Sequence, residues 1–109
     1  MYFHLILYST ILGMMSFMAA AQQGVEVYEK ACHTCHAAGV NGAPKKGDRI
    51  SWRKRLEKKS MPVFIEHVQK GFKAMPPQGR CFDCSAQDIQ AAIEWMMQDD
   101  KLFKKANQA

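Results

Sequence analysis

The feature that most constrains this chain is a pair of cysteines followed at once by a histidine, in the segment Cys32-His33-Thr34-Cys35-His36. C-x-x-C-H is the attachment signature of a c-type haem. On a helix, thiols three residues apart lie on one side and reach two vinyl groups at one porphyrin edge. The histidine after them directs its imidazole at the iron. We therefore expect one covalent haem c, with thioethers at Cys32 and Cys35 and His36 as the proximal iron ligand. The alternative is a disulfide or a metal held by the two cysteines, with His36 incidental.

Length and composition limit what can surround such a group. The chain has 109 residues, which allows one domain, and four cysteines. With 48% hydrophobic and 23% charged residues, it is neither a disordered segment nor a multi-span membrane protein. A domain of this size buries only a thin core, and such domains often depend on a disulfide, a metal or a cofactor.

Residues 1–21 are predicted to be a signal peptide. An apolar run from Leu5 to Met18 ends in Ala19-Ala20-Ala21, which is the small-residue pattern of a cleavage site, and Gln22 would begin the mature chain. The segment before the run lacks Lys and Arg, which departs from the usual pattern. A retained membrane anchor is the alternative, because residues 2–21 are just long enough to span a bilayer. Either way the rest of the chain is exported, and we expect a periplasmic protein whose thiols are oxidised or consumed by a cofactor.

The exported part reads as all-α. Apolar periodicity predicts a helix over 24–35 and another over 51–59. Ser60 and Pro62 mark the start of a third helix that Gly71 ends. Ser85 to Asp88 resembles a capping box for a last helix that carries Ile89, Ala92, Ile93 and Met96 on one stripe. Residues 38–47 and 72–84 are predicted loops, the second of them ordered. The domain is expected to cover 22–98, with a polar tail over 99–109.

A second C-x-x-C pair, Cys81 and Cys84, leaves two interpretations open. Two such pairs are the pattern of a four-thiolate structural zinc site. The separation between Cys35 and Cys81 is longer than in most zinc ribbons, and export disfavours four reduced thiols. A disulfide between Cys81 and Cys84 is therefore favoured, with the task of holding the preceding loop against the last helix.

A haem iron needs a sixth ligand, and the sequence offers five candidates: Met61, His67, Met75, Met96 and Met97. Met75 precedes Pro76-Pro77, which forces an extended and stiff backbone. A stiff loop keeps a weak thioether ligand on the iron in both redox states. Met75 is therefore predicted to be the distal ligand. The other methionines are interpreted as packing residues, and His67 as a core or surface histidine.

Taken together, these motifs resemble a class I cytochrome c and, within it, the bacterial cytochrome c5 subgroup. The resemblance covers nearly all of residues 24–97 and rests on Gly24-x-x-Val27-Tyr28-x-x-x-Cys32-x-x-Cys35-His36, Gly42-Ala43-Pro44-Lys45, Met75-Pro76-Pro77, Gly79, Cys81-x-x-Cys84-Ser85 and Ala91-Ala92-Ile93-x-Trp95-Met96. Arg80, where a second small residue is common, and the extra tail from Asp99 to Ala109 depart from the pattern.

This resemblance implies a small all-α fold with the N- and C-terminal helices crossing, Tyr28 near Trp95, and the helices wrapped around one haem c. It also implies His36 and Met75 as axial ligands, Cys32 and Cys35 as thioethers, and a Cys81–Cys84 disulfide.

The predicted function is one-electron transfer in an exported respiratory chain, because a six-coordinate iron has no open site for a substrate. The protein would be a carrier and not an enzyme. The alternative is a haem catalyst or sensor in which the sixth ligand dissociates. The net charge is +5, and a basic run predicts redox partners with acidic docking surfaces. The alternative is that the run is an ordinary solvated helix face. Nucleic acid is a poor partner for an exported protein, and membrane association requires that residues 1–21 are retained. The run comprises Lys45, Lys46, Arg49, Arg53, Lys54, Arg55, Lys58 and Lys59.

Overall fold

The computed structural model describes residues 2–3, 19 and 22–98. Within these residues no helix is long and apolar enough to cross a membrane. Most of the predicted signal peptide and all of the predicted tail over 99–109 lie outside the described residues. The division of the chain into 1–21, 22–98 and 99–109 therefore stays a prediction.

A continuous helical segment opens the described domain and carries the C-x-x-C-H motif. Residues 22–27 are α-helical, η1 (Tyr28–Cys32) is a π-helical turn, and α2 (His33–His36) completes the segment. The helix predicted over 24–35 is confirmed, but its π-turn was not predicted. A π-turn widens the helix by one residue and rotates the side chains that follow it relative to those before it. Such a turn at the first cysteine therefore changes which direction the motif faces.

Two helices joined by a short turn form the middle of the chain. In α3 (Arg49–Leu56), the Asp48 side chain caps the first turn by accepting a hydrogen bond from the Ser51 N–H at 3.0 Å. The helix predicted over 51–59 is therefore confirmed but begins and ends earlier. In α4 (Met61–Lys70), extended Ser60 precedes the helix and Pro62 lies in its first turn, as predicted. Gly71, at φ 86°, ends the helix where a side chain would be strained.

The segments between these helices are ordered although they are not long helices. A single 3₁₀ turn, η2 (Val40–Gly42), interrupts the predicted loop over 38–47. The loop over 72–84 contains a two-way backbone pairing between Phe72 and Met75, followed by the 3₁₀ turn η3 (Pro77–Arg80). Both loops carry candidate functional residues, so the defined conformation of these loops determines the geometry of the site.

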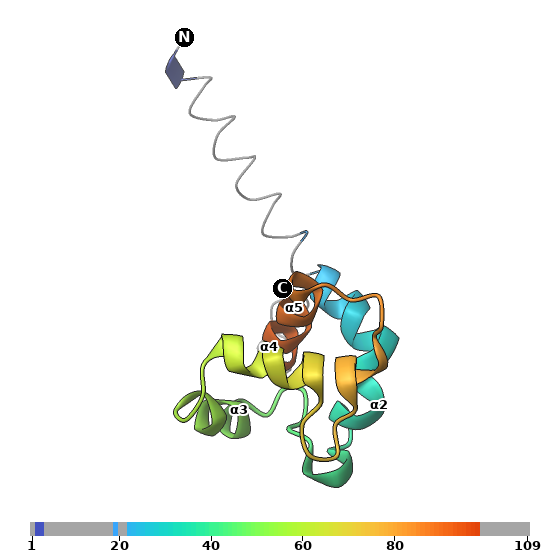
Figure 1. Cartoon of the computed structure of the whole chain (residues 1–109). Helices are drawn as coiled ribbons and strands as arrows, with labels where there is room; N and C mark the ends of the chain where they lie inside the picture. The colour runs from blue at the N-terminus through green and yellow to red at the C-terminus, as the bar shows by residue number, and fades with distance from the viewer. Residues whose placement is uncertain (1, 4–18, 20–21, 99–109) are drawn as a thin grey trace.

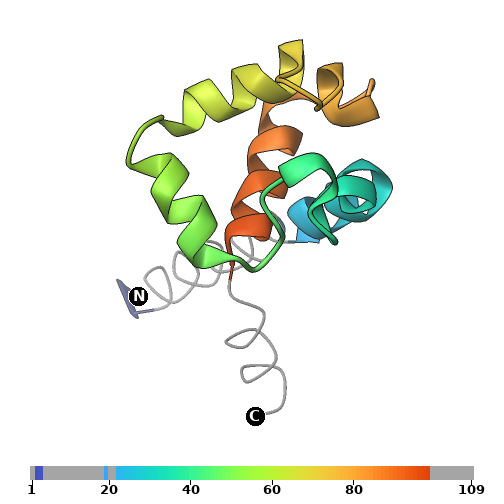
Figure 2. The same ribbon diagram turned by 90° about the horizontal axis from the view of Figure 1, so that it is seen from below.

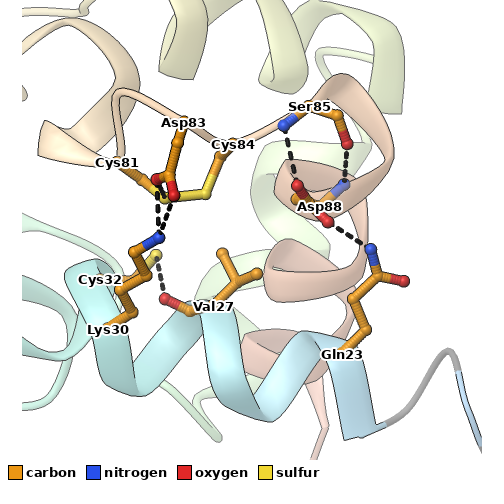
Figure 3. The surroundings of a disulfide bond; sticks show 9 residues. All are labelled: Gln23, Val27, Lys30, Cys32, Cys81, Asp83, Cys84, Ser85 and Asp88. Atoms are coloured by element: carbon orange, nitrogen blue, oxygen red, sulfur yellow. Dashed lines mark hydrogen bonds and ion pairs between the residues drawn. A yellow bond between two sulfur atoms is a disulfide. The ribbon is translucent and has the colours of Figure 1, made fainter.

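The last helix, α5 (Ala86–Met97), begins with the predicted capping box. The Asp88 N–H donates to the Ser85 hydroxyl at 3.1 Å, and the Ser85 N–H donates to the Asp88 carboxylate at 2.8 Å. The side chain of Gln23 also donates to Asp88, which joins the start of the first helix to the start of α5. Figure 3 shows the two helices held together at this point.

The first helix crosses α5 at a close approach that only glycine permits. A Cβ built on Gly24 would overlap the carbonyl group of Ala91 and lie 3.2 Å from the Cβ of Trp95. Around this crossing lies one buried cluster that includes both Tyr28 and Trp95, as expected from the resemblance. The other buried members are Trp52, Phe64, Ile89, Ile93 and Met96.

The elements follow one another around α5. Figures 1 and 2 show the first helix on one side of α5, and α3 and α4 following in turn around it. The described residues contain no β-strand beyond the single bridge at Phe72 and Met75. The prediction of a small all-α fold with crossing terminal helices is confirmed.

Replacing Gly24 by alanine tests this crossing. Intrinsic helix propensity favours alanine by about 1 kcal/mol, but the new methyl group meets the Ala91 carbonyl. We expect the overlap to outweigh the propensity, with a net loss of about 1–3 kcal/mol in the free energy of unfolding. Denaturant unfolding of the haem-loaded protein measures it. Glu26→Ala, an exposed change in the same helix, is the matched control and should stay within about 0.5 kcal/mol of wild type. Equal stability of both variants would contradict the close crossing.

The hydrogen bonds that join Asp88 to Ser85 and Gln23 should make the free energy of unfolding depend on pH. Hydrogen bonds from the Ser85 backbone, the Gln23 side chain and the Ser85 hydroxyl lower the pKa of Asp88 below its ordinary value. A carboxylate with a depressed folded-state pKa stabilises the fold above its ordinary pKa, and this stabilisation is lost as the pH falls through the folded-state value. Melting temperatures of wild type and Asp88→Asn between about pH 7 and pH 2 measure the effect. The difference between them should shrink as acid is added, and a constant difference would contradict this assignment.

Candidate haem site

His36 is held in one orientation and one tautomer by the chain around it. It is the one buried polar residue among the described positions, at 7% exposure, and its Nδ1 lies 2.8 Å from the carbonyl oxygen of Pro44. A carbonyl only accepts, so Nδ1 carries the hydrogen and donates it. The proton-free Nε2 is then the nitrogen that can bind a metal, as in metal sites where the second ring nitrogen is fixed by a carbonyl.

Burial also favours the neutral form of this imidazole. Desolvation lowers the pKa of His36 and outweighs the Pro44 hydrogen bond, which acts in the opposite direction, and the nearby Arg55 charge lowers it further. A neutral imidazole is the form that ligates iron. The donor atom is therefore available without the loss of a proton.

The indole ring of Trp52, on α3, stacks on the same imidazole. The two ring systems stack with centroids 6.2 Å apart and planes 23° from parallel. The Trp52 indole N–H donates to the Lys45 carbonyl at 3.0 Å, and the Lys46 N–H donates to the His36 carbonyl at 2.8 Å. The loop between α2 and α3 is thus tied to both rings. The sequence analysis missed Pro44 and Trp52 as partners of His36, because any carbonyl can accept a hydrogen bond and stacking depends on the tertiary path.

Cys32 and Cys35 are present as free thiols on the first helical segment. Burial raises the pKa of the Cys32 thiol to about 11, so it stays protonated at neutral pH. Its Sγ lies 3.9 Å from the Val27 carbonyl oxygen, and its side chain packs against both buried clusters of the protein. The two cysteines are therefore held on one short helical stretch directly before His36.

Met75 is fixed by its backbone and by the turn that follows it. The Phe72 N–H donates to the Met75 carbonyl at 3.0 Å, and the Met75 N–H donates to the Phe72 carbonyl at 2.9 Å. A Cβ added to Gly79 would lie 3.3 Å from the methyl carbon of Met75, and one added to Gly71 would lie 3.1 Å from its carbonyl oxygen. The two glycines let the chain fold closely around Met75, which itself is only half-buried.

The other candidate ligands are occupied elsewhere. Met96 belongs to the buried core cluster, and Met61 and Met97 pack against it. His67 stacks on Phe72 with centroids 3.9 Å apart and planes 3° from parallel. Met75 is the one member of the five that takes part in neither core cluster nor a ring stack.

Cys81 and Cys84 are joined in a disulfide whose Cα atoms are 5.4 Å apart. Between these two cysteines in the sequence, the Asp83 carboxylate forms an ion pair with the Lys30 ammonium group of η1 at 2.5 Å. Figure 3 shows this disulfide loop lying over the first helix, near Cys32. The loop after Met75 is therefore fastened to the helix that carries the C-x-x-C-H motif.

A four-thiolate zinc site does not form in this structure. In the part of the chain that is described, the residues close enough to share a metal ion are Cys81, Asp83 and Cys84, without Cys32 or Cys35. Two of these three sulfur and oxygen donors are consumed by the disulfide. The zinc alternative is excluded for the folded, oxidised protein.

The residues present fit a covalent haem. Two free thiols three residues apart and an adjacent buried imidazole with its Nδ1 already bonded are what the attachment of this group requires. A thioether on an ordered loop offers a sixth donor. Large apolar side chains on the segments that flank His36 are also solvent-exposed, as an apolar ligand surface needs. They are Val40, Ile50 and Leu56.

Comparisons with known proteins agree with this chemistry. Residues 19–96 match the model of the family described as "Cytochrome C oxidase, cbb3-type, subunit III". Cytochrome c5 of Ectopseudomonas mendocina is 38% identical over 77 residues, which is 70% of this chain and 88% of that protein. Cytochrome c-555 of Chlorobaculum tepidum is 30% identical over 90 residues, covering 79% of this chain and 82% of that protein.

A solved structure with a similar fold supports the same conclusion. A chain from the crystal structure of an electron transfer complex of nitrite reductase with cytochrome c superposes with a TM-score of 0.62 at 37% identity. The match covers 69% of this chain and 90% of that chain. The helical fold, the family match and these relatives show that the chain belongs to the cytochrome c family. It is a class I cytochrome c similar to cytochrome c5, a monohaem electron carrier with covalently attached haem c.

Proposed function

We propose that this cytochrome carries single electrons with His36 and Met75 as the two axial iron ligands and Cys32 and Cys35 as the thioether attachments. The single observation that carries the proposal is the His36 tautomer, because the Pro44 carbonyl bond leaves Nε2 as a neutral donor beside two free thiols. Met75 supports it as the one candidate thioether outside the core packing. When bound, the haem supplies a reversible one-electron couple.

The protein's own residues keep ligation unchanged during this cycle. The Pro44 carbonyl and the Trp52 ring hold the orientation of the His36 imidazole. The Phe72 pairing and the Gly79 contact hold Met75. Small structural change between two redox states means low reorganisation, which is what fast electron transfer requires. A site closed by two protein ligands leaves no position for a substrate, so the protein acts as a carrier and not as an enzyme.

The proposed location is the periplasm, and the proposed partners are redox proteins with acidic surfaces. Ala19 to Ala21 and the apolar run before them support export. The net charge of +5 supports attraction to acidic proteins. The structural neighbour is a cytochrome c in an electron transfer complex with nitrite reductase, which supports a protein, and not a small molecule, as the redox partner.

Replacing Met75 by alanine tests the distal ligand. The haem should stay attached through Cys32, Cys35 and His36, so the protein should remain folded with lower stability. Three changes should appear together: loss of the weak near-infrared sulfur-to-iron band, a lower midpoint potential, and carbon monoxide binding by the ferrous protein. Met75→His should restore six-coordination at a potential below wild type, because imidazole favours ferric iron more than a thioether does.

Met61→Ala is the matched control for that experiment. Met61 is partly buried against the core, so its truncation should cost less than the roughly 2–5 kcal/mol of a fully buried methionine and leave the near-infrared band in place. If Met61→Ala loses the band and Met75→Ala keeps it, the ligand has been placed on the wrong segment. Near-infrared absorption and redox titration of both purified variants measure the difference.

The disulfide is proposed to hold the Met75 loop rather than to carry electrons. Replacing both Cys81 and Cys84 by serine should leave the haem attached and low-spin while the melting temperature falls. So small a closed loop contributes roughly 2 kcal/mol at most through chain entropy. Thermal unfolding, followed by the haem absorption, measures it against Asp83→Asn, which weakens the Lys30 ion pair but keeps the disulfide. Loss of haem from the double variant would show that the disulfide is needed for haem attachment and would contradict this proposal.

A further inference from the structure

Trp52 is joined to His36 through its ring and, by a second route, through its indole N–H. The ring stacks on the imidazole with 6.2 Å between centroids, and the N–H donates to the Lys45 carbonyl at 3.0 Å. Lys45 follows directly after Pro44, whose carbonyl accepts the hydrogen bond from His36 Nδ1. One side chain therefore contacts both the imidazole and the loop that supplies the acceptor to that imidazole.

The peptide unit between Lys45 and Lys46 is held at both of its ends. Its C=O accepts from the Trp52 indole N–H at 3.0 Å and from the Asp48 backbone N–H at 3.1 Å, which occupies both lone pairs of that oxygen. Its N–H donates to the His36 carbonyl at 2.8 Å. A peptide unit is planar, so a contact that fixes the C=O also fixes the N–H. Trp52 thus helps to determine how the loop lies against His36.

These contacts form a closed ring, which we call the His36 clamp: Pro44, Lys45, Lys46 and Trp52 around His36. The imidazole Nδ1–H bonds the Pro44 carbonyl, and the next carbonyl along the chain bonds the Trp52 N–H. The Trp52 ring then returns to the imidazole by stacking on it. In a closed ring each contact holds its neighbours in place, so the loss of the Trp52 N–H should weaken the bond to Pro44.

Trp52 is itself positioned by contacts outside the clamp. Its side chain is buried, and its backbone N–H donates to the Asp48 carbonyl at 3.1 Å at the start of α3. The Phe64 ring meets the indole edge-on, with centroids 6.3 Å apart. A buried indole N–H needs an acceptor, and the Lys45 carbonyl is that acceptor. The core therefore fixes Trp52, and Trp52 in turn fixes the loop.

We propose that Trp52 is a positioning residue that sets the midpoint potential, because its indole N–H keeps the Pro44 carbonyl at hydrogen-bonding distance from His36. A histidine that donates its second ring N–H to a carbonyl is a stronger donor to a metal. Stronger donation favours ferric over ferrous iron and so lowers the potential. This inference rests on the proposed function, because it requires His36 as an iron ligand.

The test removes the indole N–H and keeps the ring, in the haem-loaded full chain. Trp52→3-benzothienylalanine places a sulfur atom where the N–H stood, and Trp52→Phe is the genetically encoded counterpart. The isostere decides the test if the smaller phenylalanine prevents folding. The same isostere at Trp95, a member of the same buried cluster, is the matched control. Both isostere variants lose one indole N–H from the core, but only the variant at Trp52 removes the donor to Lys45.

Redox titration gives the first readout. At a fixed solution potential, the Trp52 isostere should raise the ratio of ferrous to ferric protein about threefold, and the Trp95 isostere should leave it within about 1.5-fold of wild type. The direction separates the clamp from simple loosening of the core. Loosening admits water, which favours the more highly charged ferric haem and lowers the ratio. An unchanged or lower ratio in the Trp52 isostere would overturn the proposal.

The ring N–H of His36 gives the second readout. Its NMR resonance in the diamagnetic ferrous protein reports how fast this hydrogen exchanges with water. Removal of the Trp52 N–H should speed the exchange about tenfold, the factor expected when one hydrogen bond is lost. The Trp95 isostere should exchange at the wild-type rate. Equal exchange in wild type and the Trp52 isostere would mean that the Pro44 bond does not depend on Trp52.

The same spectra separate failure of this inference from failure of the proposed function. An imidazole bound to haem iron has its ring protons shifted far upfield by the ring current of the porphyrin. If His36 shows this shift and the Trp52 isostere changes neither the ratio nor the exchange rate, the clamp is rejected and His36 remains the ligand. If the His36 protons of wild type lack the shift, both the proposed function and this inference fail.

Discussion

The hydrogen bond from His36 Nδ1 to the Pro44 carbonyl fixes the chemistry of the whole site. It selects the tautomer, orients the ring and leaves Nε2 as the ring nitrogen that can bind a metal. Burial of the ring acts with it, since desolvation lowers the pKa of His36 and keeps the imidazole neutral. The loop that supplies this carbonyl is fastened in turn, because the Gly47 N–H donates to the Met96 carbonyl at the end of α5 at 2.8 Å. Two hydrogen bonds to backbone carbonyls thus connect His36, the proposed proximal ligand, to the core.

The two proposed ligands are held by different means. His36 ends a helical segment whose position follows from the crossing of Gly24 on Ala91, so the core determines where it lies. Met75 lies outside the core and is fixed locally, by the Phe72 pairing and the glycine turn. The disulfide at Cys81 and the ion pair of its neighbour Asp83 with Lys30 then join the two halves. This division suits a carrier, because the weaker thioether ligand is held by a loop that need not move with the core.

How much of this could be predicted from sequence depends on the range of the interactions. The capping box at Ser85 and the helix end at Gly71 are local signals, and the structure reproduces them. The C-x-x-C-H motif is equally local, and the covalent haem c that it predicts agrees with the cytochrome c relatives. The π-turn before Cys32 and the contact of Gly24 with Ala91 have no local signal, because they depend on which faces meet when the terminal helices cross. The same holds for the contact of Lys59 with the Phe72 ring, which belongs to a different segment. The basic run was visible in the sequence, but that Lys59 is the member lying over the Phe72 ring was not.

The central claim is that both axial positions of the iron are closed by this chain's own His36 and Met75. The most direct measurement is a spectrum of the haem-loaded wild-type protein, taken as ferric protein in the near infrared and as ferrous protein with carbon monoxide. The account predicts a sulfur-to-iron band in the ferric protein and a ferrous spectrum that carbon monoxide leaves unchanged. Absence of the band together with ready binding of carbon monoxide would contradict it, and would make a haem catalyst or sensor the better description of this cytochrome.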